Sequence, residues 1–397
     1  MATTGVVGQQ WRANVTEAGV VEPHDGTTSL GWYVAADDWW HDPGVDTGVR
    51  HRRLAGTAVF ETRVRIPGGD AVQRVWSVAD AGGYTIVDVR NDSPAPIAVA
   101  FTRGDLATTR RPADVPVEGI ALPAGAVVFP VGHRTTITVG LAHDPHHRRP
   151  SPLPPGLPSA EAVTRGWVSR TDVASRLDLP EQTLVEAVRA ARCELLLGGV
   201  ADAATEPERH LLALGELVRL GDVDARQAFA VAPHVATAAS AVLRRDNRLG
   251  SAALDAAAVV LAAAGERRAL ADLARIRSVA NDDATAGAAP VDDRDDVAVV
   301  PTVERRLVAD AVLFPHGVPE RWRGCDVEAH GLLAGPESRL ALALRWHGAN
   351  VAVLWEIDGE PVTIRSAAGT TPWSSAQRRG EVLWRMPAGA EPHTGTA

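Results

Sequence analysis

The densest group of aromatic and polar side chains in the 397-residue sequence lies in the segment 31–43. Indole rings offer flat apolar surfaces on which a sugar can stack, and carboxylates accept hydrogen bonds from hydroxyl groups. The segment therefore predicts a sugar-binding site. The alternative interpretation is that its tryptophans seal the edge of a β-sandwich. The candidate substrate-binding residues are Trp32, Asp37, Asp38, Trp39, Trp40 and His41.

Catalytic side chains are harder to assign from the sequence. Glycoside hydrolysis needs two carboxyl groups that face one bond, and with 49 acidic residues such pairs are easily found by chance. We therefore nominate no catalytic residue and leave open whether the chain is an enzyme. If it is one, we expect a glycoside hydrolase that uses carboxylates as acid and base. Four glutamates are better explained as capping, surface or solvent-facing groups: Glu206, Glu208, Glu216 and Glu356.

Several other chemistries are excluded by residues that the chain lacks. All 40 of its Lys and Arg residues are arginine, so Schiff bases, a pyridoxal-phosphate linkage and a Walker-type lysine are impossible. The nucleophile motif Gly-x-Ser-x-Gly and the phosphate-binding loop GxGxxG are both absent. We expect no cofactor.

Potential metal ligands occur together only once. His143, Asp144, His146 and His147 are of suitable type, but they lie in a Pro-rich stretch without a second cluster that could complete a rigid site. Cys193 and Cys325 are the two cysteines, too few for a four-cysteine zinc site. We expect no bound metal, and the sequence does not say whether the two cysteines meet.

Charge and hydropathy narrow the choice of partners. The net charge is −9 and no basic stripe is recognisable, so we expect no nucleic-acid partner. The longest apolar run, 256–264, is too short to cross a bilayer. The N-terminus lacks the pattern of a signal peptide, which makes the cytoplasm the expected location.

Periodicity predicts an α+β protein of several domains. Short runs of β-forming residues between Gly/Pro turns indicate an N-terminal β-sandwich. Apolar stripes at helical spacing, rich in alanine, predict a central array of αα-hairpins. A C-terminal antiparallel meander is predicted from alternating apolar residues in 339–346 and 351–357, continued by 362–364. The predicted boundaries are 1–142 for the sandwich, 143–179 for a Pro-rich linker, 180–280 for the helices, 281–297 for an acidic linker and 298–397 for the C-terminal β region.

This layout resembles the six-hairpin glycosidases, in which a β-sandwich is joined to an α/α toroid. The segments that carry the resemblance are "VDVRNDSPAPIAVAF" (87–101) and "LALRWHGANVAVLWEIDG" (342–359), and an actinobacterial branch without an assigned activity is the most similar. A toroid has about twelve helices, whereas the central region has room for about six, so we expect a partial toroid. No tryptophan lies between Trp167 and Trp322, and no catalytic residue of the family can be carried over.

Together these features predict a carbohydrate-related protein of glycosidase-like architecture; sugar binding without catalysis is one interpretation, and hydrolysis stays open. The alternative is a non-enzymatic scaffold or adaptor that uses its helical array as a protein-interaction surface. Self-association that completes a toroid is a third hypothesis.

Overall fold

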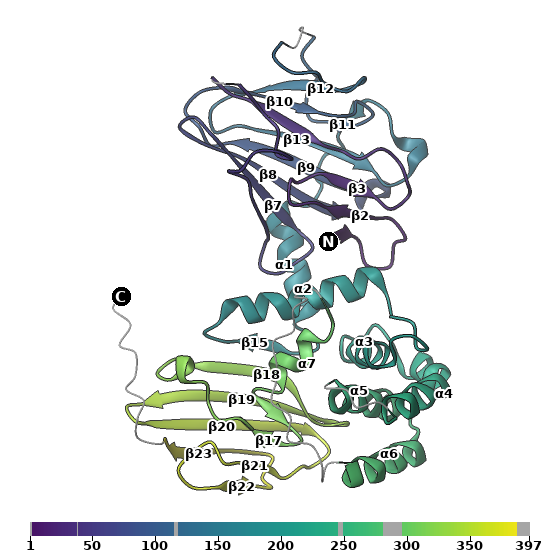
Figure 1. The fold of residues 1–397 in the computed structure, drawn as a ribbon, viewed down its shortest axis with the longest axis vertical. Coiled ribbons are helices and arrows are strands. Elements are labelled where there is room, and N and C mark those ends of the chain that lie inside the picture. Colours follow the sequence, from purple (N-terminus) through teal and green to yellow (C-terminus); the bar gives the residue numbers. More distant parts are fainter. Residues whose placement is uncertain (1, 38, 115–117, 245–248, 281–295, 387–397) are drawn as a thin grey trace. The chain divides into compact units, whose positions relative to one another are not determined.

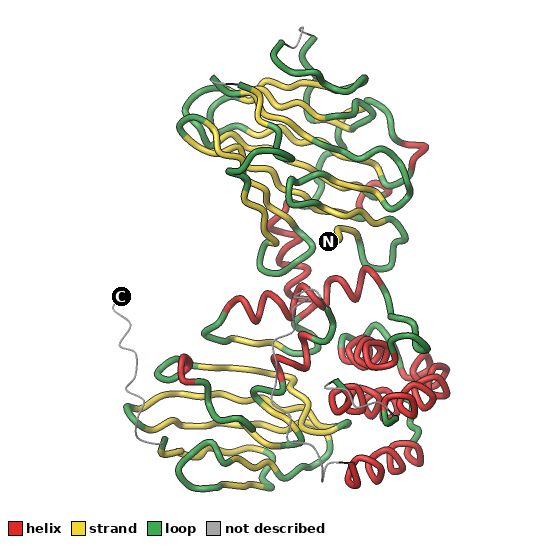
Figure 2. Tube along the Cα trace, in the orientation of Figure 1, coloured by secondary structure: helices red, strands yellow, loops and turns green. Residues whose placement is uncertain are grey.

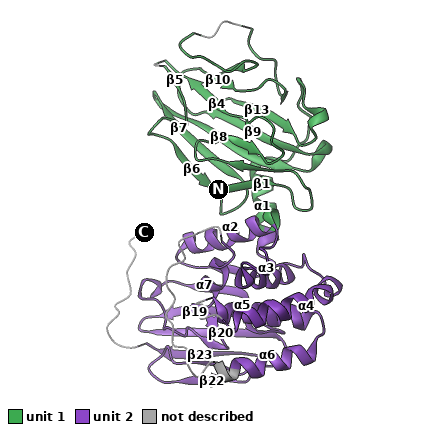
Figure 3. Cartoon of the chain, turned by 45° about the vertical axis from the view of Figure 1, so that its right-hand side comes forward, with its two compact units in different colours: residues 1–168, 196–198 green, residues 169–195, 199–397 purple. Residues whose placement is uncertain are grey.

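The computed structural model describes residues 2–37, 39–114, 118–244, 249–280 and 296–386. The chain forms two compact units, one of residues 1–168 and 196–198 and the other of residues 169–195 and 199–397 (Figure 3). Strands predominate in the N-terminal and C-terminal parts of the chain, and most of the helices lie between these parts in sequence (Figures 1 and 2). The predicted α+β class is therefore confirmed.

Unit 1 is built from three antiparallel or mixed sheets. The largest has the order β14-β11-β13-β9-β8-β7-β6, with β6 (Arg50–Arg53), β7 (Phe60–Ile66), β8 (Gly69–Val78), β9 (Tyr84–Asn91), β11 (Ala107–Thr108), β13 (Thr136–Ala142) and β14 (Ser151–Pro152). The second has the order β12-β10-β4-β5, with β4 (Trp32–Ala35), β5 (Trp40–His41), β10 (Ile97–Phe101) and β12 (Val127–Val131). The third consists of β1 (Ala2–Gly5), β2 (Arg12–Val15) and β3 (Val21–Pro23).

One apolar core joins these sheets because alternate residues of each strand point inward. Phe60, Val64 and Ile66 of β7 contribute to the same buried cluster as Val99 of β10 and Phe129 of β12. The intervening residues of β7 lie on the opposite face, where they become important below. The two larger sheets therefore share the core that the sequence predicted for its N-terminal strands.

Unit 2 combines helices with two further sheets. Its helices are α2 (Gln182–Gly198), whose last turn belongs to unit 1, α3 (Pro207–Arg219), α4 (Ala225–Val242), α5 (Gly250–Ala263), α6 (Arg267–Ala280) and α7 (Val299–Glu304). The larger sheet has the order β15-β18-β19-β20-β23, with β15 (Arg176–Asp178), β18 (Val327–Gly335), β19 (Ser338–His347), β20 (Asn350–Gly359) and β23 (Arg379–Arg385). The smaller contains β16 (Val308–Ala309), β17 (Val312–Leu313), β21 (Ile364–Ser366) and β22 (Trp373–Ser375).

Alanine and glycine allow the helices of unit 2 to approach closely. Helix α3 packs on α4 and α5, and α5 also packs on α4 and α6. At the α3–α5 contact a Cβ added to Gly215 would lie 2.7 Å from the Cβ of Ala256, so no larger residue fits without moving a helix. The helical array and the C-terminal sheet belong to one compact unit, whereas the sequence predicted two separate regions.

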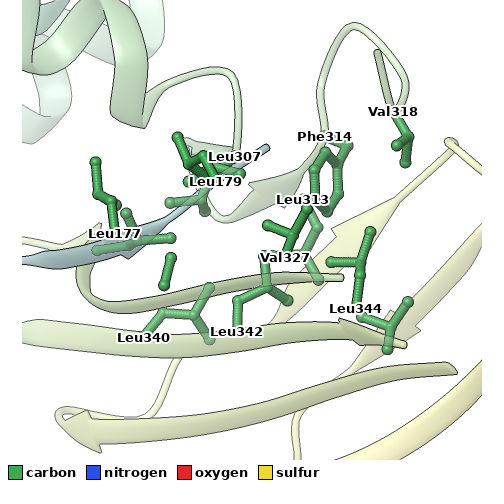
Figure 4. Packing of buried hydrophobic residues seen from close by; sticks show 14 of the residues in the cluster. Leu177, Leu179, Leu307, Leu313, Phe314, Val318, Val327, Leu340, Leu342 and Leu344 are labelled. Atoms are coloured by element: carbon green, nitrogen blue, oxygen red, sulfur yellow. The ribbon is translucent and has the colours of Figure 1, made fainter. Parts of the chain in front are cut away.

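The core beneath the larger sheet forms from one face of β19. Leu340, Leu342 and Leu344 alternate along this strand, and they pack with Leu177, Leu307 and Phe314 from segments far apart in the sequence (Figure 4). Strands β19 and β20 pair antiparallel as predicted, with Leu342 opposite Trp355. The clearest local pattern of the sequence therefore corresponds to the centre of this sheet.

Two predictions for segments of the chain differ from the structure. The stretch 143–179, predicted as a linker, contains β14, α1 (Ala160–Thr171) and β15, and Trp167 of α1 is buried. The stretch 362–364 does not continue the meander: the chain leaves β20 at Gly359, and Pro361 has no N–H to donate to the sheet. Strand β23, and not the stretch 362–364, pairs with β20. Of the predicted acidic linker, 281–295 lies outside the described residues.

The outer face of β7 carries a buried carboxylate. Glu61 is fully enclosed and accepts hydrogen bonds from Arg52, Arg63 and Arg74 on β6, β7 and β8. Although burial alone would raise the pKa of Glu61, these arginines hold it below its ordinary value. The three bonds tie adjacent strands together on the face away from the core.

Among the described residues, no helix is long and apolar enough to span a membrane.

We predict that truncation of Leu342, in the core beneath β19, destabilises unit 2 far more than truncation of an exposed leucine. Leu342→Ala should lower the free energy of unfolding of unit 2 by about 2–5 kcal/mol, because Leu342 is 2% exposed and its truncation leaves a cavity. Leu354→Ala removes the same atoms from a side chain that is 37% exposed, and should cost well under about 1 kcal/mol. Urea unfolding, with hydrogen exchange of the β19 amides to locate the effect, checks both. Equal losses would contradict the assigned faces of the sheet.

We also predict a pH-dependent contribution from Asp88. This residue lies on β9 opposite Arg74, and burial raises its pKa to about 7 because the attraction of Arg74 offsets only part of the desolvation. The folded state therefore holds a proton that the unfolded state releases near pH 4, so the contribution of Asp88 to stability falls as pH rises from about 4 to 7. Asp88→Asn should raise the free energy of unfolding by on the order of 2 kcal/mol at pH 8 and have little effect near pH 4.

The measurement for Asp88 is the melting temperature of wild type and variant from pH 4 to pH 8. Exposed Asp80 provides the matched control, and Asp80→Asn should leave the pH profile of the wild type unchanged. A constant difference between Asp88→Asn and wild type across the range would refute the raised pKa.

Candidate functional site

The predicted sugar-binding segment does not assemble as one site. Strand β4 alternates, so Trp32 and Val34 point into the core of unit 1. Trp32 is 2% exposed and its Nε1 donates to the carbonyl of Ala18 at 2.9 Å. His41 is also buried, with its Nδ1 2.9 Å from a carboxylate oxygen of Asp46. The strand period therefore places Trp32 and His41 inside the sandwich, where neither presents an exposed surface to a sugar.

The remaining residues of the segment lie at the turn between β4 and β5. Asp37 is exposed, and the ring of Trp39, which is 62% exposed, tilts against that of His41 at a centroid distance of 5.2 Å. Trp40 is half-buried and its Nε1 donates to the carbonyl of Glu118 at 2.9 Å. Asp38 lies outside the described residues. This turn presents one exposed indole ring, that of Trp39.

The histidines of the stretch 143–147 point in different directions. His143 is buried, stacks on Trp11 at a centroid distance of 4.1 Å, and has its Nε2 3.2 Å from the hydroxyl of Thr85. Burial, with a smaller effect of nearby arginines, lowers its pKa to about 4. Asp144 instead accepts a hydrogen bond from the backbone of His146. Within the described part of the chain, no group of three or more His, Cys, Asp or Glu residues is arranged to hold a metal ion.

A cavity of about 490 Å³ lies within unit 2. Its walls come from α3, α5, α6, α7, the β16–β17 hairpin and the turn between β18 and β19. Most of the wall is small and apolar, and none of the lining residues is aromatic. Seven charged residues also line it: Glu216, Arg219, Asp255, Arg277, Glu304, Arg305 and Asp310.

The deeper wall of the cavity is a buried ion-pair network, here called the inner cluster: Arg192, Glu216, Arg219 and Glu304. The Arg192 Nε donates to Glu216 at 2.6 Å, and its Nη2 donates to Glu304 at 3.0 Å. Arg219 bridges the same two glutamates from the other side, with both bonds 2.8 Å long. All four side chains are at most 6% exposed. Two arginines and two glutamates thus neutralise one another away from water.

The opposite charges within the inner cluster shift the pKa values of Glu216 and Arg219. Burial alone would raise the pKa of Glu216, but the positive charges of Arg219 and Arg192 outweigh it and hold the pKa below its ordinary value. For Arg219, the two glutamates overcome burial and raise the pKa. Glu216 is therefore assigned as an ionised partner of arginine and does not have the surroundings of a general acid.

Two atoms of the inner cluster have hydrogen-bonding capacity left over. The Nε of Arg219 is buried and finds no hydrogen-bond partner among the described residues. On Glu304, one oxygen accepts three bonds, from Ser175, Arg192 and Arg219, whereas no described residue donates to the other. One N–H donor and one carboxylate acceptor therefore remain on neighbouring side chains that line the cavity.

The opposite wall carries a second network, here called the rim ring: Asp255, Arg277, Arg305 and Asp310. Arg277 bonds both aspartates, reaching Asp310 at 2.8 Å. Arg305 also bonds both, at 2.5 Å to Asp255 and 3.4 Å to Asp310. Burial raises the pKa of Asp255, since the two arginines only partly offset it. The alternating charges form a closed ring that is more exposed than the inner cluster, at 18–37% per side chain.

The rim ring depends on a strained turn. Asp310 and Ala311 connect β16 to β17 and have φ angles of 49° and 60°. A two-residue hairpin with both φ values positive strongly favours glycine or asparagine, and alanine adopts this region at a cost. Strain of this kind persists where surrounding contacts hold it in place. Here the bonds of Asp310 to two arginines do so, and the strained residues lie on the cavity wall.

Sequence pattern alone does not identify this site. It favours a capping or surface role for Glu216 and gives no role to Glu304, Arg192 or the four residues of the rim ring. One signal was available: Arg192 follows two alanines in a helix whose neighbouring turns are apolar, and a charge at such a position needs a buried partner. The identity of that partner depends on α7, which lies more than a hundred residues further along the chain.

No protein-family model matches this chain, and no curated protein shows a significant match to it.

We predict that the inner cluster is required for the stability of unit 2. Glu304→Gln should lower the free energy of unfolding by on the order of 3 kcal/mol, because it leaves two buried arginines facing one carboxylate. Glu356→Gln makes the same chemical change at an exposed position of β20 and should change stability by less than about 0.5 kcal/mol. Urea denaturation of both variants is the measurement, and similar small effects would show that the network carries little of the stability.

Proposed function

We propose that this protein binds a small, neutral, polyhydroxylated molecule, such as a monosaccharide, in the cavity of unit 2. The observation that carries the proposal is a half-open cavity bounded by two ion-pair networks in which every charge already has a partner. The proposal keeps the carbohydrate class predicted from the sequence and moves the site from segment 31–43 to the cavity.

The size of the cavity suits a ligand of this kind. A volume of about 490 Å³ lies within the range of small-molecule sites, roughly 300–1,000 Å³. Small side chains such as Ala252, Ala256 and Val259 offer an apolar wall against which the C–H groups of a sugar ring can pack. Without aromatic rings in the lining, we expect affinities in the millimolar range.

Charge balance favours a neutral ligand over an ionic one. Four arginines face four carboxylates in the inner cluster and the rim ring together. An anion or cation would have to displace a partner that is already bonded, leaving a charge unpaired in a buried wall. A hydroxyl group can donate a hydrogen bond to the free oxygen of Glu304 without disturbing either network.

The same features support binding rather than hydrolysis. A glycosidase needs a carboxyl group that is protonated near neutral pH opposite a second, ionised one. The pKa of Glu216 is lowered, and although that of Asp255 is raised, both of its oxygens accept bonds from arginine. The likeness to six-hairpin glycosidases and the partial toroid remain predictions.

A protein-interaction role for the helices is the second candidate. It is favoured by Phe229 on α4, which is 60% exposed, and by Ile276 on α6, which is 41% exposed. These side chains lie on the helical array that the sequence predicted as an adaptor surface. The sugar experiment below separates the two candidates, since an adaptor predicts no response to any sugar.

The test is a titration of the full chain with neutral hexoses, pentoses and disaccharides, followed by thermal shift and ligand-observed NMR. We expect at least one sugar to raise the melting temperature and to saturate at millimolar concentration. Ala274→Phe should abolish that response, because Ala274 lines the cavity from the exposed side of α6. Ala271→Phe places the same ring on an exposed position of α6 outside the lining and should bind as the wild type does. Saturable binding that survives Ala274→Phe would place the sugar elsewhere, and no binding at all would remove the proposal.

A further inference from the structure

The outer face of the seven-stranded sheet in unit 1 gathers arginines that are scattered in the sequence. Because Phe60 and Val64 of β7 point into the core, Arg63 and Arg65 point the other way. Strand pairing places Arg50 directly opposite Arg63. The arginine face, as we call this surface, consists of Arg50, Arg52, Arg63, Arg65 and Arg74.

Two carboxylates, those of Glu61 and Asp70, form ion pairs with these five arginines. Glu61 is bonded by Arg52, Arg63 and Arg74, as described above. Asp70 lies 3.3 Å from Arg50, 3.8 Å from Arg63 and 3.3 Å from Arg65. Even with Glu161, which also pairs with Arg74, positive charges exceed negative ones by two.

Neighbouring charges on the sheet do not remove this excess. Arg90, at the next outward position of β9, is paired with Asp92, so that pair is neutral. Asp88 faces Arg74 across β9, and with a pKa of about 7 it is only partly ionised at neutral pH. A surplus of positive charge on one sheet is notable in a chain whose net charge is −9.

The positive groups are on the outside and the negative groups are recessed. The side chains of Arg50, Arg52 and Arg65 are 66%, 63% and 66% exposed. Those of Glu61 and Asp70 are 0% and 13% exposed. A molecule that approaches this face therefore meets guanidinium groups held in position by the carboxylates beneath them.

The arrangement has a cost for folding that a ligand would offset. Like charges directly opposite each other on adjacent strands are destabilising, and Arg50 and Arg63 form such a pair. Guanidinium groups bind carboxylate, sulfate and phosphate through paired hydrogen bonds. An anion that spans the two arginines would convert their repulsion into binding.

We propose that the arginine face binds an anionic polysaccharide, a linear polymer of sugars that carry carboxylate or sulfate groups. Adjacent strands are about 5 Å apart, so the arginines of β6, β7 and β8 repeat at roughly the length of one sugar residue. Nucleic acid fits less well: Phe60 and Trp76, the Phe and Trp of these strands, are buried, and no exposed ring among them can stack on a base. The surface is a flat sheet without an element that could enter a groove.

The test uses the full chain and four probes: polygalacturonate, dextran sulfate, neutral dextran and single-stranded DNA. Binding is measured by affinity electrophoresis or biolayer interferometry at several salt concentrations. We expect binding to one or both acidic polysaccharides that weakens steeply with salt, and none to neutral dextran. DNA that binds at least as tightly as both polysaccharides would overturn the assignment.

A pair of double variants locates the site. Arg50→Gln with Arg65→Gln removes two exposed charges of the arginine face, and should weaken binding by about tenfold and reduce its salt dependence. Arg379→Gln with Arg385→Gln removes two exposed charges of β23 in unit 2 and should change binding by less than about twofold. Circular dichroism and melting curves verify that both variants fold.

Equal weakening in the two double variants would show a response to net charge alone and would refute the proposal. So would unchanged binding in the Arg50/Arg65 variant. The outcome is independent of the cavity in unit 2, because the probes are polymers and the substituted residues lie in unit 1. Failure of the sugar titration described above therefore leaves this inference standing, and the reverse also holds.

Discussion

The guanidinium of Arg192 is the constraint on which unit 2 depends. It is buried in the middle of α2, where its five donors could not be left without partners. Its bonds reach α3 through Glu216, α7 through Glu304, and the segment before β15 through the carbonyls of Thr171 and Ser175. Four segments, separated by up to about 130 residues of chain, must therefore come together for this one group to be satisfied. The deep wall of the cavity is a result of that requirement.

The chemistry of the cavity follows from how these charges are used. A carboxylate that holds a buried arginine is stabilised in its ionised form and is poorly suited to give up a proton. Glu304 bonds both arginines through one oxygen and keeps a second oxygen that can accept a hydrogen bond from a ligand. The inner cluster can thus hold the fold together and still recognise hydroxyl groups. The rim ring repeats the arrangement with more exposed side chains and a strained turn.

Local pattern accounts for the parts of the fold that the sequence predicted. Alternation in β19 and β20 predicted their pairing and their buried face, since a shift by one residue would expose every leucine. Apolar stripes predicted α2 and its neighbours for a similar reason. Pattern did not reveal that the helices and the C-terminal sheet form one unit, because that depends on contacts between distant segments. Nor did it separate Trp32 from Trp39: both are aromatic residues in one short segment, and only the direction of β4 places one in the core and the other in solvent.

Both candidate sites illustrate what a single sequence leaves hidden. Arg50, Arg63 and Arg74 belong to three strands, and their proximity requires the register of two hairpins. Glu216 and Glu304 belong to helices separated by α4, α5 and α6. In each case the residue types are ordinary, and their significance lies in pairings that tertiary structure creates.

The contact between Gly215 and Ala256 gives the cavity one boundary made of main chain. Where α3 meets α5, only the methyl group of Ala256 could be removed to gain space, because Gly215 has no side chain. We therefore expect changes that admit bulkier molecules to act at α6 and the β16–β17 hairpin, where the cavity wall carries longer side chains.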